Sequence, residues 1–182
     1  FFVGLMLGQL FYGPLSDKFG RKPMITLGLI IFIVGSIGCA FAETVLQLHV
    51  LRLIQGLGGS IGMVIAFAMI KDLYQGPMMG KMMSMVLAIL GLSPVLAPLI
   101  GNGLQALESW RAIFVFLAVY SAIILTACVI FLPETRSSTL RQEFKLSQTF
   151  RHYLNIAANP QFIVYALTLC FAQAGFFAYL AG

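Results

Sequence analysis

The sequence predicts an all-α protein that crosses a membrane several times. Of its 182 residues, 60% are hydrophobic and only 9% are charged, whereas about 25% of the residues in a soluble globular domain are charged. The apolar runs are long enough to cross a hydrocarbon core, which takes about 20 residues. A cleaved signal peptide does not explain them, because they recur along the whole chain.

The apolar runs indicate six helical segments. Residues 1–12 are expected to form the second part of a helix, in which Gly4 and Gly8 make a G-x-x-x-G pair that permits close helix contact in lipid. Further spans are expected at about 24–42, 48–70, 82–107, 112–132 and 162–182. Because only about a dozen apolar residues precede the first polar segment, too few for a span, we expect the sequence to be a fragment.

The basic residues predict the orientation of the chain. Nine of the eleven fall in alternate loops: Lys18, Arg21, Lys22, Lys71, Lys81, Arg136, Arg141, Lys145 and Arg151. The positive-inside rule makes these loops cytoplasmic. The net charge of +5 therefore reflects topology, and no nucleic-acid partner is expected. Residues 140–157 in the last of these loops are either a helix lying on the inner leaflet or a flexible connector.

The polar segment 13–23 separates the first two helices. Its charges cannot lie in hydrocarbon, where each costs at least about 2.5–3.5 kcal/mol at the midplane, so we expect a tight turn in which Pro23 enters the next helix. Its pattern, G-x-x-x-D-x-x-G-R-K-P, resembles the loop between helices 2 and 3 of major facilitator superfamily transporters. The charges either determine topology alone or make specific contacts.

The resemblance implies a gate latch formed by Gly13, Asp17, Arg21 and Asp72. Arg21 would bridge to Asp72, and Asp17 would interact with the start of a helix in the second half, where an anion suits the helix dipole. Gly13 would allow close approach of backbones. The latch would form when the cytoplasmic side is closed and break when that side opens.

Arg52 lies early in a predicted span, with Gln55 one turn further on the same face. An arginine at this depth faces a bundle interior or an aqueous cavity, because the lipid side is too costly. The alternative is an arginine that snorkels to the outer interface. The pattern R-x-x-Q-G resembles the fourth-helix motif of the same superfamily, which implies that Arg52 takes part in proton coupling.

Four residues of the fourth span, Gly91, Pro94, Pro98 and Gly101, fall within roughly 80° of one another on a helix. Two prolines would kink this helix, and the small stripe would let another helix pack closely. An ordinary flexible membrane helix is the alternative. The pattern resembles the fifth-helix motif of drug:proton antiporters, which implies a seal between two halves and favours export.

Taken with 8–17, 71–74 and 110–114, these motifs resemble the bicyclomycin/chloramphenicol-resistance subfamily of twelve-helix drug:proton antiporters. The resemblance implies part of helix 2 through helix 7: residues 1–132 in the N-terminal half (helices 2–6), 133–160 as the cytoplasmic inter-half loop and 161–182 as the first helix of the C-terminal half. It also implies a monomer in the bacterial inner membrane, exporting small drug-like molecules by rocker-switch alternating access. The runner-up is an importer or metabolite exporter of the same fold.

The sequence favours neither an enzyme nor a metal site. Cys39, Cys128 and Cys170 lie in apolar runs without metal-ligand spacing, and no embedded nucleophile with a base is present. No cofactor is expected, since a proton gradient would drive transport. All six acids lie at helix ends or in loops: Asp17, Glu43, Asp72, Glu108, Glu134 and Glu143. The resemblance implies a proton-coupling acid in helix 1, before these residues.

Overall fold

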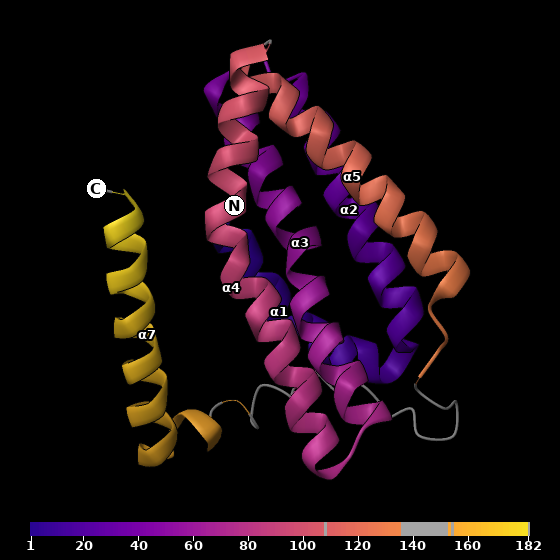
Figure 1. The fold of residues 1–182 in the computed structure, drawn as a ribbon, viewed down its shortest axis with the longest axis vertical. Coiled ribbons are helices and arrows are strands. Elements are labelled where there is room, and N and C mark those ends of the chain that lie inside the picture. The colour runs from indigo at the N-terminus through magenta and orange to yellow at the C-terminus, as the bar shows by residue number, and fades with distance from the viewer. Residues whose placement is uncertain (108, 136–152, 154, 182) are drawn as a thin grey trace. The chain divides into compact units, whose positions relative to one another are not determined.

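The computed structural model describes residues 1–107, 109–135, 153 and 155–181. Their long helices are α1 (Phe2–Phe19), α2 (Arg21–Ala40), α3 (Val45–Leu73), α4 (Gly76–Leu107), α5 (Trp110–Phe131) and α7 (Pro160–Ala181) (Figure 1). The chain forms two compact units, Phe1–Gln142 and Glu143–Gly182, and the division falls inside the expected 133–160 connector. The assignment of the units to two halves stays a prediction. The surface helix considered for 140–157 lies largely outside the described residues.

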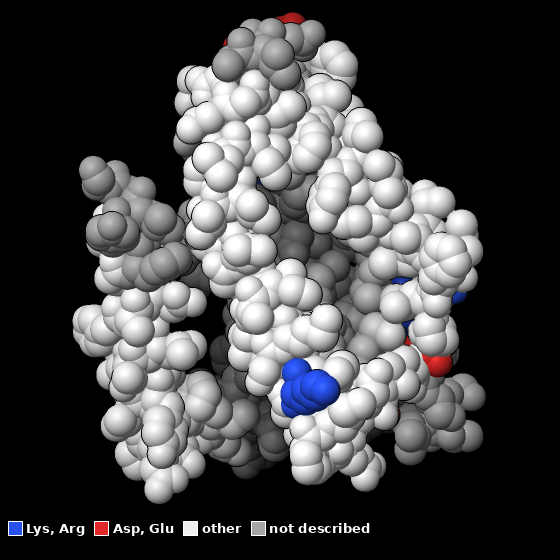
Figure 2. Space-filling model, in the orientation of Figure 1, with Lys and Arg blue, Asp and Glu red and all other residues white. Residues whose placement is uncertain are grey.

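The described helices confirm an all-α membrane protein. Four are long and apolar enough to cross a membrane, over Arg21–Ala40, Val45–Leu73, Gly76–Gln105 and Trp110–Phe131. Figure 2 shows a face on which charged atoms are sparse and lie toward the helix ends. These four match the spans expected at about 24–42, 48–70, 82–107 and 112–132, although α4 begins at Gly76 and not near Met82. The segment expected at 162–182 is helical as α7, but its role as a span stays a prediction.

The turn expected at 13–23 is reduced to one residue, Gly20. Helix α1 continues to Phe19 with Pro14 inside it, and α2 starts at Arg21. Gly20 has φ 101°, a conformation that glycine adopts without the penalty of a side chain. Pro23 falls in the first turn of α2, where backbone N–H groups have no partner within the helix. The polar residues are therefore helical, and the direction of the chain changes at Gly20 alone.

A capping box starts α3 earlier than the apolar pattern indicates. The Thr44 hydroxyl accepts a hydrogen bond from the Gln47 backbone N–H at 3.2 Å, and the Gln47 side chain accepts one from the Thr44 N–H, also at 3.2 Å. These bonds satisfy N–H groups that the first turn leaves without partners. The T-x-x-Q signal was present in the sequence and places the helix start three residues before the expected one.

Glycines allow α3 to pack closely against both α1 and α2. A Cβ on Gly4 or Gly8 would collide with Leu53 or Ser60 of α3, so the expected G-x-x-x-G contact is confirmed. A Cβ on Gly35 of α2 would lie 2.8 Å from the Gln55 backbone. Such small residues let helices make close van der Waals contact in lipid, where no hydrophobic force drives helices together.

The small-residue face of α3 is used unevenly. A Cβ at Gly58 would lie 2.6 Å from the Gly28 carbonyl oxygen and 2.8 Å from the Phe32 Cα. At Gly62, one turn further along α3, it would meet no described atom within 4 Å. The two glycines therefore form a matched pair for testing whether the close contact matters.

We expect Gly58→Ala to lower stability, because the added methyl group must push α2 away from α3. Overpacking of this kind costs about 1–3 kcal/mol. Gly62→Ala is the control and should be neutral or slightly stabilising, since Ala favours helix over Gly by about 1 kcal/mol. Thermal unfolding of the intact protein in detergent would measure both. Equal melting temperatures for the two variants would contradict the packing described above.

Candidate functional site

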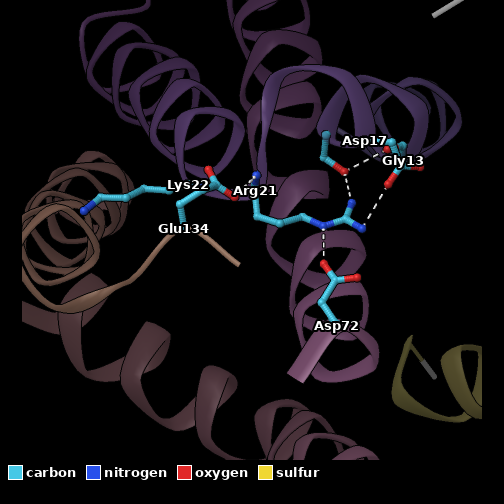
Figure 3. Close-up of polar contacts among 7 residues, drawn as sticks. Gly13, Asp17, Arg21, Lys22, Asp72 and Glu134 are labelled. Atoms are coloured by element: carbon cyan, nitrogen blue, oxygen red, sulfur yellow. Dashed lines mark hydrogen bonds and ion pairs between the residues drawn. The ribbon is translucent and has the colours of Figure 1, made fainter. Parts of the chain in front are cut away.

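Arg21, the first residue of α2, joins three helices through its side chain (Figure 3). Its Nη2 lies 2.9 Å from Asp17 Oδ1 of α1, and its Nε lies 2.9 Å from Asp72 Oδ2 near the end of α3. The Arg21 side chain is only 6% exposed. The expected contact between Arg21 and Asp72 is therefore confirmed.

Each carboxylate compensates the buried guanidinium at a different edge. Planar guanidinium groups bind carboxylates through several N–H donors in fixed directions, and a third donor of Arg21, Nη1, bonds the hydroxyl of buried Ser16. Removing one partner of a buried ion pair typically costs about 3–5 kcal/mol, because the remaining charge is uncompensated. The cluster therefore favours the arrangement in which the end of α1, the start of α2 and the end of α3 stay together.

Two details of the expected latch stay predictions. Asp17 pairs with Arg21 within the first unit, and its expected contact with a helix of the second half is not tested by this pairing. A Cβ on Gly13 would meet no described atom within 4 Å, so no close backbone approach to Gly13 is seen among the described residues. The Gly13 carbonyl instead accepts a hydrogen bond from the Ser16 hydroxyl at 2.8 Å, which holds that hydroxyl beside Arg21.

Glu134, which follows α5, is a member of this cluster that sequence reasoning missed. Its carboxylate accepts hydrogen bonds from the backbone N–H groups of Arg21 at 2.9 Å and Lys22 at 3.2 Å (Figure 3). An anion at a helix N-terminus satisfies unbonded N–H groups and complements the helix dipole. Lys22 in turn donates to the Val129 carbonyl at 2.8 Å, near the end of α5. The sequence indicated this role of Glu134 only by placing an acidic residue just after a predicted span.

Arg111, near the start of α5, binds the C-terminal end of α2. Its Nε donates to the Ala40 carbonyl at 3.0 Å and its Nη2 to the Ala42 carbonyl at 2.8 Å. These carbonyls lie at the C-terminal end of α2, where a cation suits the dipole. The guanidinium also lies over the Trp110 ring, 4.6 Å from its centroid. Helix α5 is thus tied to α2 at both ends by charged groups.

A second polar cluster lies inside the spans. Arg52 Nη1 donates to Gln55 Oε1 at 3.0 Å, as their helical spacing predicts, and Gln55 Nε2 donates to the Ser36 hydroxyl of α2 at 2.7 Å. The Arg52 guanidinium carbon lies 5.2 Å from the Phe1 ring centroid and 5.3 Å from that of Phe114. Through this bond Gln55 connects α3 to α2. Its side chain is 0% exposed, so it lies in the interior of the helix bundle and not on the wall of an aqueous cavity.

The proline–glycine stripe of α4 is not packed against the rest of the first unit. Pro94 and Pro98 both lie inside one helix. A Cβ on Gly91 or Gly101 would meet no described atom within 4 Å. The described residues therefore place the stripe on an open face of α4, and its predicted role as a seal is not assigned to any contact within this unit.

The family model of the Major Facilitator Superfamily matches residues 1–182. The chain belongs to this superfamily. It is 29% identical over 180 residues to a bicyclomycin resistance protein homolog of Haemophilus influenzae, covering 99% of this chain and 45% of that protein. It is 33% identical over 175 residues to multidrug resistance protein D of Escherichia coli K12, covering 96% and 43%. Multidrug resistance protein 3 of Bacillus subtilis is 44% identical over 114 residues, covering 63% and 22%.

Membership of the superfamily agrees with the resemblance that the motifs carried. The chain spans less than half the length of these curated relatives. Because the superfamily and the relatives' names concern transport and drug resistance, the expectation of a transporter and not an enzyme is confirmed. Among the described residues, no three His, Cys, Asp or Glu side chains lie close enough to hold a metal ion.

We expect Glu134→Gln to destabilise the junction of α2 and α5. The variant keeps a hydrogen-bonding oxygen but loses the negative charge at the α2 N-terminus, an effect worth about 0.3–1 kcal/mol at an exposed helix end. Glu43→Gln removes the same charge from an exposed site beyond the other end of α2 and serves as control. Thermal unfolding in detergent measures both. A loss no larger for Glu134→Gln than for Glu43→Gln would disprove the capping role.

Proposed function

We propose that the protein is a proton-coupled exporter of small drug-like molecules in the bacterial inner membrane. It acts as a monomer by rocker-switch alternating access, in which one half of the transporter moves against the other around a midplane site. A proton gradient supplies the driving force, and no cofactor takes part.

The contact that carries this proposal is the ion-paired cluster at Arg21. Arg21 and Asp72 are 51 positions apart in the chain, yet their side chains meet at 2.9 Å, as the latch of this transporter family requires. A cluster that fastens three helix ends favours one shape of the cytoplasmic edge, and transport then requires the contacts to break. Because the Arg21 side chain is buried while Asp17 and Asp72 are 36% and 17% exposed, breaking the contacts leaves a buried charge without its partners, which is costly, and opening becomes a discrete step.

Arg52 supports the coupling part of the proposal. Its side chain is cationic, and it lies seven positions after Val45, the first residue of α3, which is about 10.5 Å along the helix axis. A fixed cation at this depth stabilises a carboxylate in its ionised form and thereby favours proton release nearby. This behaviour suits an exchanger that alternates between protonated and drug-bound forms.

The direction of transport rests on two supports. The relatives named above carry bicyclomycin resistance or multidrug resistance in their names. The stripe on α4 keeps its two prolines and two glycines on an open helix face, where it is available for a second helix. Both the names of the relatives and the stripe on α4 favour export of drug-like molecules over import.

The proposal is tested with the intact protein in everted membrane vesicles that carry a respiratory pH gradient. Addition of chloramphenicol or bicyclomycin should collapse the gradient, followed by a pH-sensitive fluorescent dye. Arg52→Ala should reduce the drug-dependent rate at least about tenfold, because the fixed charge is lost. A drug response that is unchanged in Arg52→Ala would remove Arg52 from the coupling path. No response to any drug, with the protein present in the membrane, would overturn drug export in favour of a metabolite transporter.

Asp17→Asn tests the latch. We expect several-fold slower transport with unchanged membrane insertion, because one of the two carboxylates that compensate Arg21 becomes neutral. The matched control is Lys18→Gln, which alters the neighbouring exposed charge. Transport by Asp17→Asn at the wild-type rate, with equal protein in the membrane, would refute the latch.

A further inference from the structure

Ser36 lies one turn before the C-terminal end of α2, with its side chain fully buried against α3. Its hydroxyl donates to the Phe32 carbonyl of the same helix at 2.8 Å and accepts from Gln55 Nε2 at 2.7 Å. Buried polar groups in lipid are satisfied by partners within the protein. Ser36 is therefore the point at which Gln55 is attached to the neighbouring helix.

Hydrogen counting fixes the orientation of the Gln55 amide. A serine hydroxyl has one hydrogen, and here it is directed to the Phe32 carbonyl, so the oxygen can only accept from Gln55. The arginine side chain has donors and no acceptor, so the opposite end of the amide, Oε1, must face Arg52. Both ends of the amide thus agree with their neighbours in one orientation only.

The adjacent glycine fixes the position of the same amide. A Cβ on Gly35 would lie 2.8 Å from both the N and the Cα of Gln55, so the two backbones touch beside Ser36. Gln55 is 0% exposed, and it has no room to move away from the hydroxyl. Close packing and hydrogen bonding together hold Gln55 Oε1 at a fixed place.

The guanidinium of Arg52 depends on that oxygen for its direction. The Phe1 and Phe114 rings lie near it, at 5.2 and 5.3 Å from its carbon, and aromatic faces attract a cation without fixing its rotation as a hydrogen bond does. The bond from Nη1 to Gln55 Oε1 is directional. It connects Arg52 through Gln55 to the body of α2.

We propose that Ser36 is a positioning residue for Arg52, acting through Gln55. This inference rests on the proposed role of Arg52 in transport. Without the Ser36 hydroxyl, Gln55 Nε2 loses its acceptor and is left buried without a partner, which is costly. The amide is then no longer held at that end, so Oε1 shifts away from Arg52 Nη1 and the guanidinium loses its directional partner. Ser36 touches no substrate in this scheme and affects transport only through the direction of Arg52.

Ser36→Ala tests the inference against Ser60→Ala. Ser60 is a matched control because it is equally buried, at 1% exposure, while its hydroxyl bonds Leu57 of its own helix. In the vesicle assay, Ser36→Ala should lower the maximal drug-dependent rate about tenfold or more, with the KM for the drug changed less than about threefold. Ser36→Thr keeps the hydroxyl and should restore most of the rate. Ser60→Ala should transport within about twofold of wild type.

A double-mutant cycle on melting temperature adds a readout that does not need transport. If Ser36 acts on Arg52 through Gln55, Ser36→Ala should cost less in an Arg52→Ala background, by several degrees. Ser60→Ala should cost the same in either background. Should Ser36→Ala fail to accumulate in membranes, Ser36→Cys keeps the size of the side chain with a much weaker acceptor.

The outcomes separate this inference from the proposed function. A slow Ser36→Ala, rescued by threonine, together with a coupled cycle supports it. Wild-type rates in Ser36→Ala, an equal defect in Ser60→Ala, or additive melting shifts would overturn it. If the wild-type protein transports no drug but the cycle is coupled, the proposed function fails while the positioning of Arg52 by Ser36 holds.

Discussion

The close approach of α2 to α3 is the constraint on which the rest of the first unit depends. Lipid gives helices no hydrophobic reason to associate, so the pair is held by van der Waals contact and a few hydrogen bonds. Gly35 and Gly58 remove the side chains that would separate the backbones. Only at this distance can Ser36 reach Gln55, and only then does Arg52 have a fixed partner.

Within the part of the chain that the structure describes, α2 takes part in polar contacts with α1, α3 and α5. Glu134 and Lys22 connect its N-terminal end to α5. Arg111 connects its C-terminal end to the same helix, and Ser36, one turn before that end, connects it to α3. Each contact pairs a charge or dipole with its complement, and the one between Ser36 and Gln55 is buried, where such pairs are strongest. Helix α2 is therefore held at both ends, and the Arg21 side chain extends from an anchored end.

The spans and the G-x-x-x-G contact could be predicted from the sequence, because hydropathy and the spacing of small residues are local signals. The pairing of Arg21 with Asp72, which are 51 positions apart, was expected only from the resemblance of the motif to a known family. The sequence did not locate the chain reversal at Gly20, since helical and turn conformations compete there and only the backbone angle decides. Glu134 was missed because its partner Arg21 lies 113 positions away in the chain. Ser36 was missed because its partner Gln55 lies 19 positions away. The sequence placed Gln55 correctly on the same helix face as Arg52. It could not show that α2 packs against this face, because the close approach at Gly35 depends on the packing of two helices.

Because Gly20 alone joins α1 to α2, the connection cannot absorb an added or removed residue. Each residue added to or removed from a helix turns everything beyond it by 100° and shifts it by 1.5 Å. Between the reversal at Gly20 and the Ser36 hydroxyl there is only continuous helix, so a single insertion there would rotate Ser36 away from Gln55 while leaving Arg21 in place. The spacing between the two clusters is therefore set in whole residues, and length variation between them is expected to be far less tolerated than substitution.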